Sequence, residues 1–497
     1  MGCLLSIDLG TSSVKAVVMS ADGAVIASES KEYPISSPSP GWAEQDPELW
    51  WSSAVEAVRK VSIQHKESIR AIGLSGQMHG TVLLGKDAAP LYPAVIWPDL
   101  RSQKEVREIQ AAAGEALLGT EAGTAPAPGF MGPTLLWLKK HMPDVFQNTA
   151  QVILPKDYLL LRLTGEISTD VTDASGTGLF NNPDRTWSTA ILEKIGLPEK
   201  IFPESLQPEE IPGSLRRAAA EELGLKPGIP VASGCADQTA QAVGNGIREP
   251  GTASITVGSG GQIFLPLDTP AENNKFKYHV FCHAPKDRWY ILGAMLTAGL
   301  SLRWLRDFLY PGHGTEAFEQ MSGQASKVPP GAGSLFFLPY LAGERSPIMD
   351  PDARGCFIGL TLSHTREHLC RAVMEGTAFA LRQILETLEA NGCRADFLKG
   401  AGGGLNDPVW RQITADVLGR PIAVSPCREL TGRGAACIAG IGAGIYSGYD
   451  AVPDIHPGRH ESAVPDQNTA CRYDELYNIW TGIYPELKGL FTHARRS

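Results

Sequence analysis

The chain has 497 residues, of which 43% are hydrophobic and 20% charged, and this composition excludes a disordered protein, a fibre and a coiled coil. Its 44 Lys and Arg residues and 54 Asp and Glu residues give a net charge of −10, so we expect neither nucleic acid nor an anionic membrane as a partner. At about 150 residues per domain, the length predicts two large domains or three small ones.

The first half of the chain alternates apolar strand patterns with glycine turns and amphipathic helices. Asp46 followed by Pro47 predicts a helix start, because Asp favours the N-cap and Pro the first helical position. Strands are expected at 3–7, 14–19, 25–27, 69–74 and 229–232, and further helices at 101–112, 155–163 and 188–195.

A second series of elements begins after the glycine-containing linker at 244–251 and repeats the strand, turn and strand of the N-terminus. We expect strands at 253–257, 262–265 and 397–401 and a long helix at 366–390. Because strands and helices alternate along the whole chain, the predicted fold class is α/β, with one domain at 1–246 and a second at 251–497.

The cysteine pattern indicates a reducing compartment. The nine cysteines include no Cys-x-x-Cys pair, which favours free thiols and a cytoplasmic protein. No apolar run has the roughly 18 residues of a membrane span, and no signal peptide precedes the first strand. Gly2 and Cys3 match a lipidation pattern, but the apolar residues 3–7 predict a buried strand instead.

Two glycine turns have the composition of phosphate-binding loops. The first follows Asp8 and the second occupies residues 258–261. Backbone N–H groups and hydroxyls in such turns can hold phosphate oxygens, and Asp8 can hold a hydrated Mg²⁺ beside them, although a plain hairpin explains each turn equally well. The candidate phosphate-binding residues are Gly10, Thr11, Ser12, Lys15, Gly258 and Ser259.

Asp237 follows an apolar strand, which places its carboxylate at the edge of a sheet where α/β proteins bind ligands. There it can act as a general base on a substrate hydroxyl. The same position also suits the N-cap of a helix, and the two roles are compatible.

Two further patterns point to ligand contacts. Three consecutive glycines at 402–404 allow close approach of a nucleotide base and ribose, although a tight strand-to-helix turn is the alternative. Met78 and His79, and also Trp97 and Asp99, follow apolar strands and suit a polyol, but by themselves they do not define a site.

The string from His364 to His368 matches a His-x-x-Glu-His pattern found in metalloproteases. We expect the long helix to start near Thr365 or Arg366, which leaves His364 outside it. The two histidines would then not share one helix face, so a zinc site is disfavoured.

Longer motifs identify the chain as similar to the FGGY family of carbohydrate kinases over nearly its whole length. They are the string DLGTSSVK at 8–15, LPKDYL at 154–159, the pattern from Leu338 to Gly355, and the signature from Gly355 to Glu375. The Gln-Met-His-Gly at 77–80 resembles the element of those members that act on xylulose, and members that act on gluconate carry a similar Met-His.

This resemblance implies the two-domain actin–hexokinase fold, of ribonuclease H-like type, with a cleft between the domains. It implies ATP and Mg²⁺ as cofactors, with sugar and the first phosphate loop in the domain at 1–246 and nucleotide in the domain at 251–497. Asp237 would be the catalytic base and Asp8 would hold the metal through water, with Asp237 beside it. The implied sugar contacts are Met78, His79 and Gln238, and the implied adenosine contacts are Gly403, Gly404, Asn406, Asp407 and Trp304.

The activity implied by the resemblance is ATP-dependent phosphorylation of D-xylulose to D-xylulose 5-phosphate. Pro98 and Thr134 replace the usual Asn and Lys of relatives, and Ser259 lies in a turn that departs from the commoner Gly-Thr-Ser-Gly, so gluconate, ribulose or another polyol is an alternative substrate. An alternative of another class is a non-catalytic, nucleotide-gated module of the actin-like fold. A homodimer is left open as the assembly.

Overall fold

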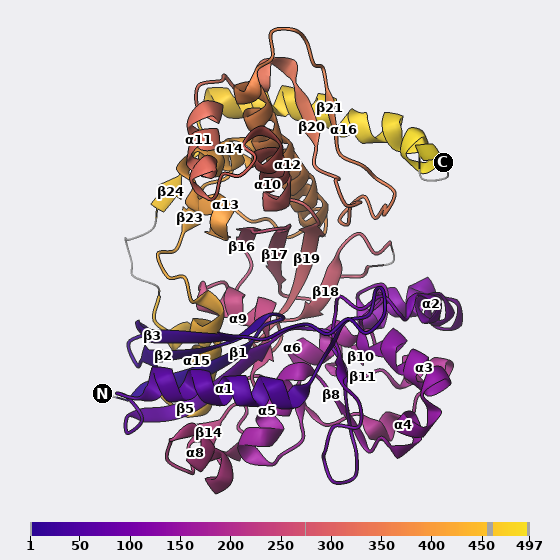
Figure 1. Ribbon diagram of the computed structural model, residues 1–497, viewed down its shortest axis with the longest axis vertical. Coiled ribbons are helices and arrows are strands. Elements are labelled where there is room, and N and C mark those ends of the chain that lie inside the picture. The colour runs from indigo at the N-terminus through magenta and orange to yellow at the C-terminus, as the bar shows by residue number, and fades with distance from the viewer. Residues whose placement is uncertain (1, 274, 455–460, 495–497) are drawn as a thin grey trace. The chain divides into compact units, whose positions relative to one another are not determined.

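The computed structural model describes residues 2–273, 275–454 and 461–494, which form two compact units (Figure 1). The first unit consists of Met1–Arg248, Leu267–Tyr290 and Cys427–Ile455. The second consists of Glu249–Pro266, Ile291–Pro426 and His456–Ser497. The chain therefore returns to the first unit after it has entered the second.

The first unit is built on a mixed sheet with the strand order β13–β14–β5–β1–β2–β3, in which β15 also pairs with β5. β1 is antiparallel to β2 and parallel to β5. Its strands are β1 (Cys3–Leu9), β2 (Ser13–Ser20), β3 (Val25–Glu32), β5 (Ile69–Gly76), β13 (Gly213–Ser214), β14 (Pro230–Val231) and β15 (Cys235–Ala236). Shorter strands of this unit are β4 (Glu44–Gln45), β6 (Val82–Leu84), β7 (Ala94–Val95), β8 (Gln151–Ile153), β9 (Thr169–Asp170), β10 (Phe180–Asn181), β11 (Thr186–Trp187), β12 (Ser205–Leu206) and β18 (His279–Cys282).

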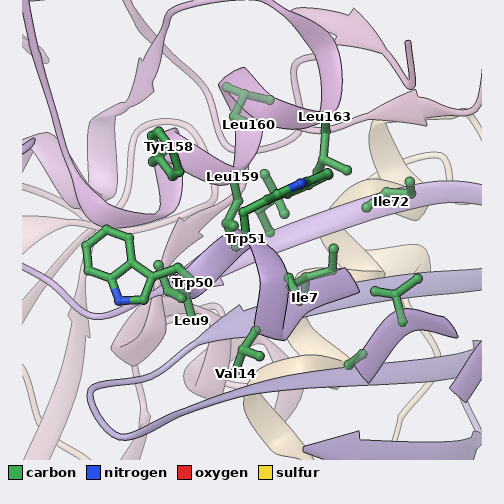
Figure 2. Packing of buried hydrophobic residues seen from close by; sticks show 14 of the residues in the cluster. Ile7, Leu9, Val14, Trp50, Trp51, Ile72, Tyr158, Leu159, Leu160 and Leu163 are labelled. Carbon is green, nitrogen blue, oxygen red and sulfur yellow. The ribbon is translucent and has the colours of Figure 1, made fainter. Parts of the chain in front are cut away.

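Helices cover both faces of this sheet, because alternate residues of a buried strand point to opposite sides. Ile7 and Leu9 pack with Trp50, Trp51 and other residues of α1 and α5 on one face (Figure 2). Leu4 packs on the other face with residues of α9 and α15. The helices are α1 (Pro47–Ser62), α2 (Gln103–Leu117), α3 (Met131–His141), α4 (Pro143–Asn148), α5 (Pro155–Thr164), α6 (Val171–Ala174), α7 (Thr189–Ile195), α8 (Arg217–Leu223), α9 (Asp237–Gly244) and α15 (Leu430–Gly442), with single turns η1 (Leu118–Ala122), η2 (Ser175–Thr177), η3 (Glu199–Ile201) and η5 (Tyr449–Ala451).

Glycines allow α15 to approach β5 and α9 closely. A Cβ atom on Gly73 of β5 would lie 2.0 Å from the carbonyl oxygen of Ala435. One on Gly434 of α15 would lie 1.8 Å from the carbonyl oxygen of Ala240. Any larger residue at either position would force the backbones apart.

The second unit contains strands in the order β19–β17–β16–β22–β23–β24. β16 is antiparallel to β17 and parallel to β22, which repeats the arrangement of β1 with β2 and β5 in the first unit. The strands are β16 (Thr252–Val257), β17 (Gly261–Leu267), β19 (Trp289–Met295), β20 (Phe336–Leu338), β21 (Cys356–Ile358), β22 (Phe397–Ala401), β23 (Ile422–Val424) and β24 (Glu461–Ala463).

The central helix of the second unit is α12, which is buried over most of its length and contacts α11, α14 and β20. The helices are α10 (Gly299–Leu309), α11 (Glu316–Ala325), α12 (Arg366–Glu389), α13 (Gly403–Asn406), α14 (Pro408–Leu418) and α16 (Gln467–Ala494), with the single turn η4 (Ala332–Ser334).

The local sequence predictions agree with most of these elements. Asp46 is the N-cap of α1 and accepts a hydrogen bond from the Glu48 backbone N–H at 2.9 Å. One strand is shorter than predicted, since β14 covers Pro230–Val231 rather than 229–232. Gly234 ends the extended stretch there, with φ of 83° and so little room that a Cβ would lie 2.3 Å from the Leu74 carbonyl oxygen.

The N-terminus and the cysteines also have defined places. Cys3 is 6% exposed in β1, which confirms the buried strand, while Met1 lies outside the described residues. All nine cysteines lie in the described part of the chain and none of them forms a disulfide. Of the helices in the described ranges, none combines the length and apolar character that crossing a membrane requires.

Candidate active site

Asp8 and Asp237 lie at the same end of three adjacent strands of the first unit. Asp8 on β1 is opposite Ser75 on β5, and Ser75 is in turn opposite Cys235 on β15, two residues before Asp237. The Ser75 hydroxyl donates to Asp8 Oδ1 at 2.9 Å. Burial raises the pKa of Asp8, and Ser75 and the Lys15 charge oppose that rise.

The turn after Asp8 directs its carbonyl groups into the protein. The Tyr33 hydroxyl donates to the Gly10 carbonyl, Gln45 Nε2 donates to the Thr11 carbonyl at 2.7 Å, and the Tyr33 backbone N–H donates to the Ser12 carbonyl at 3.0 Å. In the described part of the chain, no acceptor lies within hydrogen-bonding distance of the backbone N–H groups of Thr11 and Ser12. The turn therefore presents donors, as an anion-binding loop does.

Lys15 follows the same turn and forms an ion pair with Glu429, Nζ to Oε2 at 2.7 Å. Both side chains are partly exposed, at 37% and 19%, so the pair contributes little to stability. Lys15 is thus held beside the turn by a residue that the sequence analysis did not single out.

Asp237 is the first residue of α9 and is only partly exposed. Burial and the Asp8 charge raise its pKa to about 7, and hydrogen bonds from Gln238 oppose that rise. A carboxyl group with this pKa changes protonation state near neutral pH, as a general base requires. The N-cap interpretation was wrong, because the N-cap residue is Ala236 and Asp237 lies within the first helical turn.

His79 has a constrained position next to Met78. Its backbone is in the left-handed region, with φ of 75°, and its ring stacks on Phe130 at 3.9 Å between centroids. Nδ1 lies 2.6 Å from the carbonyl oxygen of Gly176, and since a carbonyl only accepts, this contact requires the Nδ1–H tautomer.

Trp97 and Asp99 differ in what they can contact. Trp97 is 42% exposed and its Nε1–H donates to Thr11 Oγ1 at 2.8 Å, so it lies beside the first glycine turn. Asp99 is fully buried, and its carboxylate accepts from Arg101 and from the Ala43 backbone N–H at 2.7 Å. Asp99 therefore holds the loop that carries Trp97.

The second unit contains a cavity of about 330 Å³ at the glycine residues predicted to contact adenosine. Its lining comes from the turn after β16 and from helices α10 to α14. The lining residues are Val257, Gly258, Ser259, Gly299, Leu302, Arg303, Phe318, Met374, Gly403, Gly404, Asp407 and Trp410. The structure thus brings together Gly258, Ser259, Gly403, Gly404 and Asp407 from the predicted set.

The two glycines at 403 and 404 have different surroundings. Within the described part of the chain, a Cβ on Gly403 would meet no neighbouring atom within 4 Å, so this position opens onto free space. A Cβ on Gly404 would lie 2.4 Å from Val257 Cγ1 and 3.1 Å from the Trp410 ring. Gly403 leaves room for a ligand, and Gly404 is needed for packing.

The turn at 258–261 resembles the first turn in its hydrogen bonding. The Gly258 carbonyl accepts from the Gly299 N–H at 2.8 Å, and the Ser259 carbonyl accepts from the Ala298 and Leu300 N–H groups at 3.0 Å. These donors belong to the start of α10. The carbonyl groups of this turn are therefore directed into the protein as well.

Trp304 and Asn406 are not among the residues that line the cavity. Trp304 instead stacks near Phe308, Phe337 and Phe357, with centroid distances of 6.4–6.5 Å. Its neighbour Arg303 lines the cavity, because successive residues of a helix point about 100° apart. The sequence analysis missed Arg303, Phe318 and Met374.

The histidine pattern at 364–368 has no metal-binding geometry. α12 begins at Arg366, which leaves His364 before the helix as predicted. His364 Nε2 lies 3.1 Å from the Gly333 carbonyl oxygen, and His368 Nδ1 lies 3.0 Å from Thr365 Oγ1. Among the residues that the structure describes, no group of three or more His, Cys, Asp or Glu residues is placed to hold a metal ion.

A two-unit α/β protein with a carboxylate at one sheet edge and a glycine-lined cavity in the other unit has the features of a sugar kinase. The chain matches the N-terminal domain of the FGGY family of carbohydrate kinases over residues 3–244 and the C-terminal domain over residues 253–443. It belongs to that family and is a carbohydrate kinase, with ATP as a substrate.

Among its relatives, xylulose kinase from Bacillus subtilis is 34% identical over 99% of this chain and 98% of its own. Gluconokinase from the same organism is 30% identical over 98% of this chain and 97% of its own. The crystal structure of xylulose kinase from Rhodospirillum rubrum superposes with a TM-score of 0.91 at 32% identity, covering 99% of this chain and 100% of that one. The predicted actin–hexokinase type of fold is confirmed by such neighbours.

Proposed function

We propose that this kinase transfers the terminal phosphoryl group of ATP to D-xylulose, giving D-xylulose 5-phosphate. The observation that carries the proposal is the half-buried Asp237 at the sheet edge of the first unit, with a pKa raised to about 7 by burial and by Asp8. Asp237 accepts the proton of the attacking sugar hydroxyl. Positioning and electrostatic stabilisation supply most of the remaining catalysis in phosphoryl transfer.

Each glycine turn, taken by itself, is a proposed binding loop for phosphate oxygens of ATP. Support comes from the first turn, whose Thr11 and Ser12 N–H groups have no acceptor among the described residues, and from the second turn, whose Gly258 and Ser259 carbonyls accept from the start of α10. Adenosine occupies the 330 Å³ cavity of the second unit, with Gly403 beside it and Arg303 as a cation at its wall. The roles of 1–246 in sugar binding and 251–497 in nucleotide binding, and the cleft between them, remain predictions.

The residues near Asp237 fit a hydrated Mg²⁺ ion. Mg²⁺ is usually bound through one or two carboxylates together with substrate phosphates, and Asp8 and Asp237 are two carboxylates whose charges repel one another. Asp8 would hold the ion through water, with Asp237 beside it. When bound, the ion neutralises charge on the phosphate oxygens.

The choice of xylulose rests on the loop at 77–80 and on the relatives. The B. subtilis and R. rubrum relatives are both named xylulose kinase. Met78, His79, Trp97 and Gln238 are the proposed sugar contacts. Gluconate is the alternative, because a gluconokinase is also a relative over nearly the whole chain.

The test is ADP release measured by a coupled assay over D-xylulose, D-ribulose, gluconate and a set of polyols. The proposal predicts the highest kcat/KM with D-xylulose. A higher kcat/KM with gluconate would assign the alternative substrate. ADP release that no sugar stimulates would support the nucleotide-gated module instead, since such a module needs no base at residue 237.

Two coarser properties are proposed with it. A cytoplasmic location is supported by the absence of disulfides among the nine described cysteines. Fusing the protein to a redox-sensitive fluorescent protein and imaging the cells would test this location. A homodimer is the proposed assembly to test by light scattering, where a monomer mass at working concentration would exclude it.

A further inference from the structure

One short segment of the first unit contacts both parts of the proposed sugar site. This segment, which we call the 170–177 turn, runs from Asp170 to Thr177 through α6 and η2. Near its start, Thr172 Oγ1 accepts a hydrogen bond from the Ala236 backbone N–H at 3.0 Å. Near its end, the Gly176 carbonyl accepts from His79 Nδ1 at 2.6 Å.

The contact with Ala236 lies at the start of α9. Ala236 is the N-cap residue of α9 and directly precedes Asp237. Its N–H is buried, so loss of this partner would leave an unsatisfied donor next to the proposed base. The backbone at residue 237 is thus anchored by one side chain from a distant part of the sequence.

Only a hydroxyl serves at residue 172. The Thr172 O–H donates to Asp170 Oδ1, and its oxygen accepts from Ala236 at the same time. Both residues 170 and 172 are fully buried. Valine has the same shape as threonine but can make neither bond, whereas serine can make both.

The 170–177 turn is itself anchored by buried charges. Asp170 caps α6, and its Oδ2 pairs with Lys156 Nζ at 2.8 Å. Lys156 also pairs with Asp157, and all three side chains are fully buried. Breaking such a buried pair is costly, so the turn has a well-defined position.

The other end of the turn determines the position of the sugar contacts. A Cβ on Gly176 would lie 3.0 Å from Met78 Cε and 3.1 Å from His79 Nδ1. Phe130 stacks on the ring of His79 with an interplanar angle of 5°. The His79 ring therefore has no room to move away from a side chain at 176 without losing a contact.

We propose that Thr172 and Gly176 are positioning residues, which hold the catalytic base and the sugar-contacting side chains in one fixed relation. This inference rests on the proposed function, in which Asp237 is the base and Met78 and His79 contact sugar. Thr172 acts on Asp237 through Ala236, and Gly176 acts on His79 and Met78. Changes at the two ends therefore affect different kinetic constants.

The test measures kcat, KM for D-xylulose, KM for ATP and Tm for Thr172→Val, Thr172→Ser and Gly176→Ala. Thr172→Val should lower kcat about 10- to 100-fold with sugar KM little changed, because a small displacement of a reacting group costs up to about 10²-fold. Thr172→Ser should restore kcat to within about 3-fold of wild type, since it keeps both hydrogen bonds. Gly176→Ala should raise sugar KM about 10-fold or more, because a displaced His79 loses a buried sugar contact, and should leave ATP KM unchanged.

Two control variants make the same kinds of substitution elsewhere. Thr377→Val removes a buried hydroxyl whose one partner among the described residues is the Val373 carbonyl within α12. Gly323→Ala adds a methyl group where no atom lies within 4 Å. Both should keep the kinetic constants of the wild type.

A Thr172→Val variant with wild-type kcat, or a Thr172→Ser variant as slow as Thr172→Val, would overturn the inference for the base. An unchanged sugar KM in Gly176→Ala would overturn the positioning role for His79. If Thr172→Val does not fold, the Gly176→Ala measurement still decides the inference. The variant Asp237→Asn distinguishes failure of the proposed function from failure of the positioning role. An active Asp237→Asn enzyme contradicts the proposed function. An inactive Asp237→Asn enzyme together with a normal Thr172→Val enzyme contradicts only the positioning role.

Discussion

The two units form their candidate sites by opposite means. In the first unit, Asp237 and His79 are held by buried hydrogen bonds and ion pairs that extend through Thr172 and Asp170 to Lys156. In the second unit, the cavity has largely apolar walls, and a Cβ on Gly403 at its edge would meet none of the described atoms within 4 Å. The first site should therefore be sensitive to loss of polar groups and the second to added bulk.

The largest effect is expected at the base. Asp237→Asn should lower kcat about 10²- to 10⁴-fold, the range for loss of a general base, with ATP KM nearly unchanged because Asp237 does not line the nucleotide cavity. Steady-state kinetics with both substrates measure this. Retention of most activity would remove the contrast between the two sites.

The Asp237 carboxyl also predicts how kcat/KM of the wild-type enzyme depends on pH. Because the carboxylate is the active form and the pKa of Asp237 is raised to about 7, kcat/KM should rise with pH up to about 7 and then level off. A pH–rate profile at constant ionic strength measures it. A flat profile between pH 5 and 8 would contradict a base with this pKa.

His79→Ala removes the proposed sugar contact together with the Nδ1 hydrogen bond to Gly176. Loss of one buried hydrogen bond to a sugar hydroxyl costs about 1–3 kcal/mol, so kcat/KM for the best sugar should fall roughly 5- to 150-fold. ATP hydrolysis without sugar should remain at the wild-type rate. Wild-type kinetics over the whole sugar panel would make the 77–80 loop purely structural.

In the second unit, Gly403→Val and Gly404→Ala form a pair that tests what each glycine does. Gly403→Val should raise ATP KM about 10-fold or more at normal Tm, because its side chain fills open space in the cavity. Gly404→Ala should lower Tm, since its Cβ would overlap Val257, and overpacking costs about 1–3 kcal/mol. Thermal melts beside ATP titrations measure both, and the reverse result would exchange the two roles.

A smaller effect is expected at Asp173, a fully buried carboxyl whose two oxygens find no hydrogen-bond partner among the described residues. Burial raises its pKa well above the ordinary 3.8, Lys156 opposes this, and Asp170 adds to it. The folded state therefore retains a proton that the unfolded state loses, so the contribution of Asp173 to stability is greatest below about pH 3.8 and falls as the pH rises toward the folded pKa.

Asp173→Asn keeps the shape of the neutral acid without this dependence. It should be more stable than wild type at pH 7, by about 1–3 kcal/mol, and the gain should shrink near pH 4. Tm measured against pH for the two proteins tests it. A gain that is the same at every pH would mean that Asp173 does not titrate on unfolding.

The smallest effect is expected for Trp304→Ala. Trp304 does not line the cavity, so ATP KM should stay within about 2-fold of wild type, the scatter of near-neutral surface changes. Arg303→Ala, one residue earlier on α10, should raise ATP KM more. Isothermal titration with ATP would distinguish them, and a larger loss at Trp304 would place the nucleotide elsewhere.

Local features of these sites could be predicted from the sequence, whereas features that depend on distant contacts could not. The glycine turns and the edge position of Asp237 follow from strand patterns and turn chemistry. Arg303, Phe318 and Met374 come from three separate helices, and a residue such as Met374 in an apolar helix looks like any core residue. Trp304 was expected at the nucleotide from the family resemblance alone, and its neighbour Arg303 lines the cavity instead.

The positioning role of Thr172 could not be predicted from the sequence for a related reason. Its partner Ala236 is 64 residues away and offers only a backbone N–H, which leaves no trace in residue type. The Asp237 alternatives show the same limit, since an Asp at a strand end suits both an N-cap and the first helical turn. The structure decides between them through the position of Ala236.

The return of residues 427–455 to the first unit has a consequence for synthesis of the protein. α9 and β5 lie against α15 so closely that Gly73 and Gly434 leave no space for a side chain, yet α15 begins only at Leu430. A ribosome at about 5–20 residues per second reaches it roughly 10–40 s after residue 237. During that interval the nascent first unit exposes the apolar surface that α15 will cover, so chaperone binding to a released chain of 1–426 should exceed binding to one of 1–455.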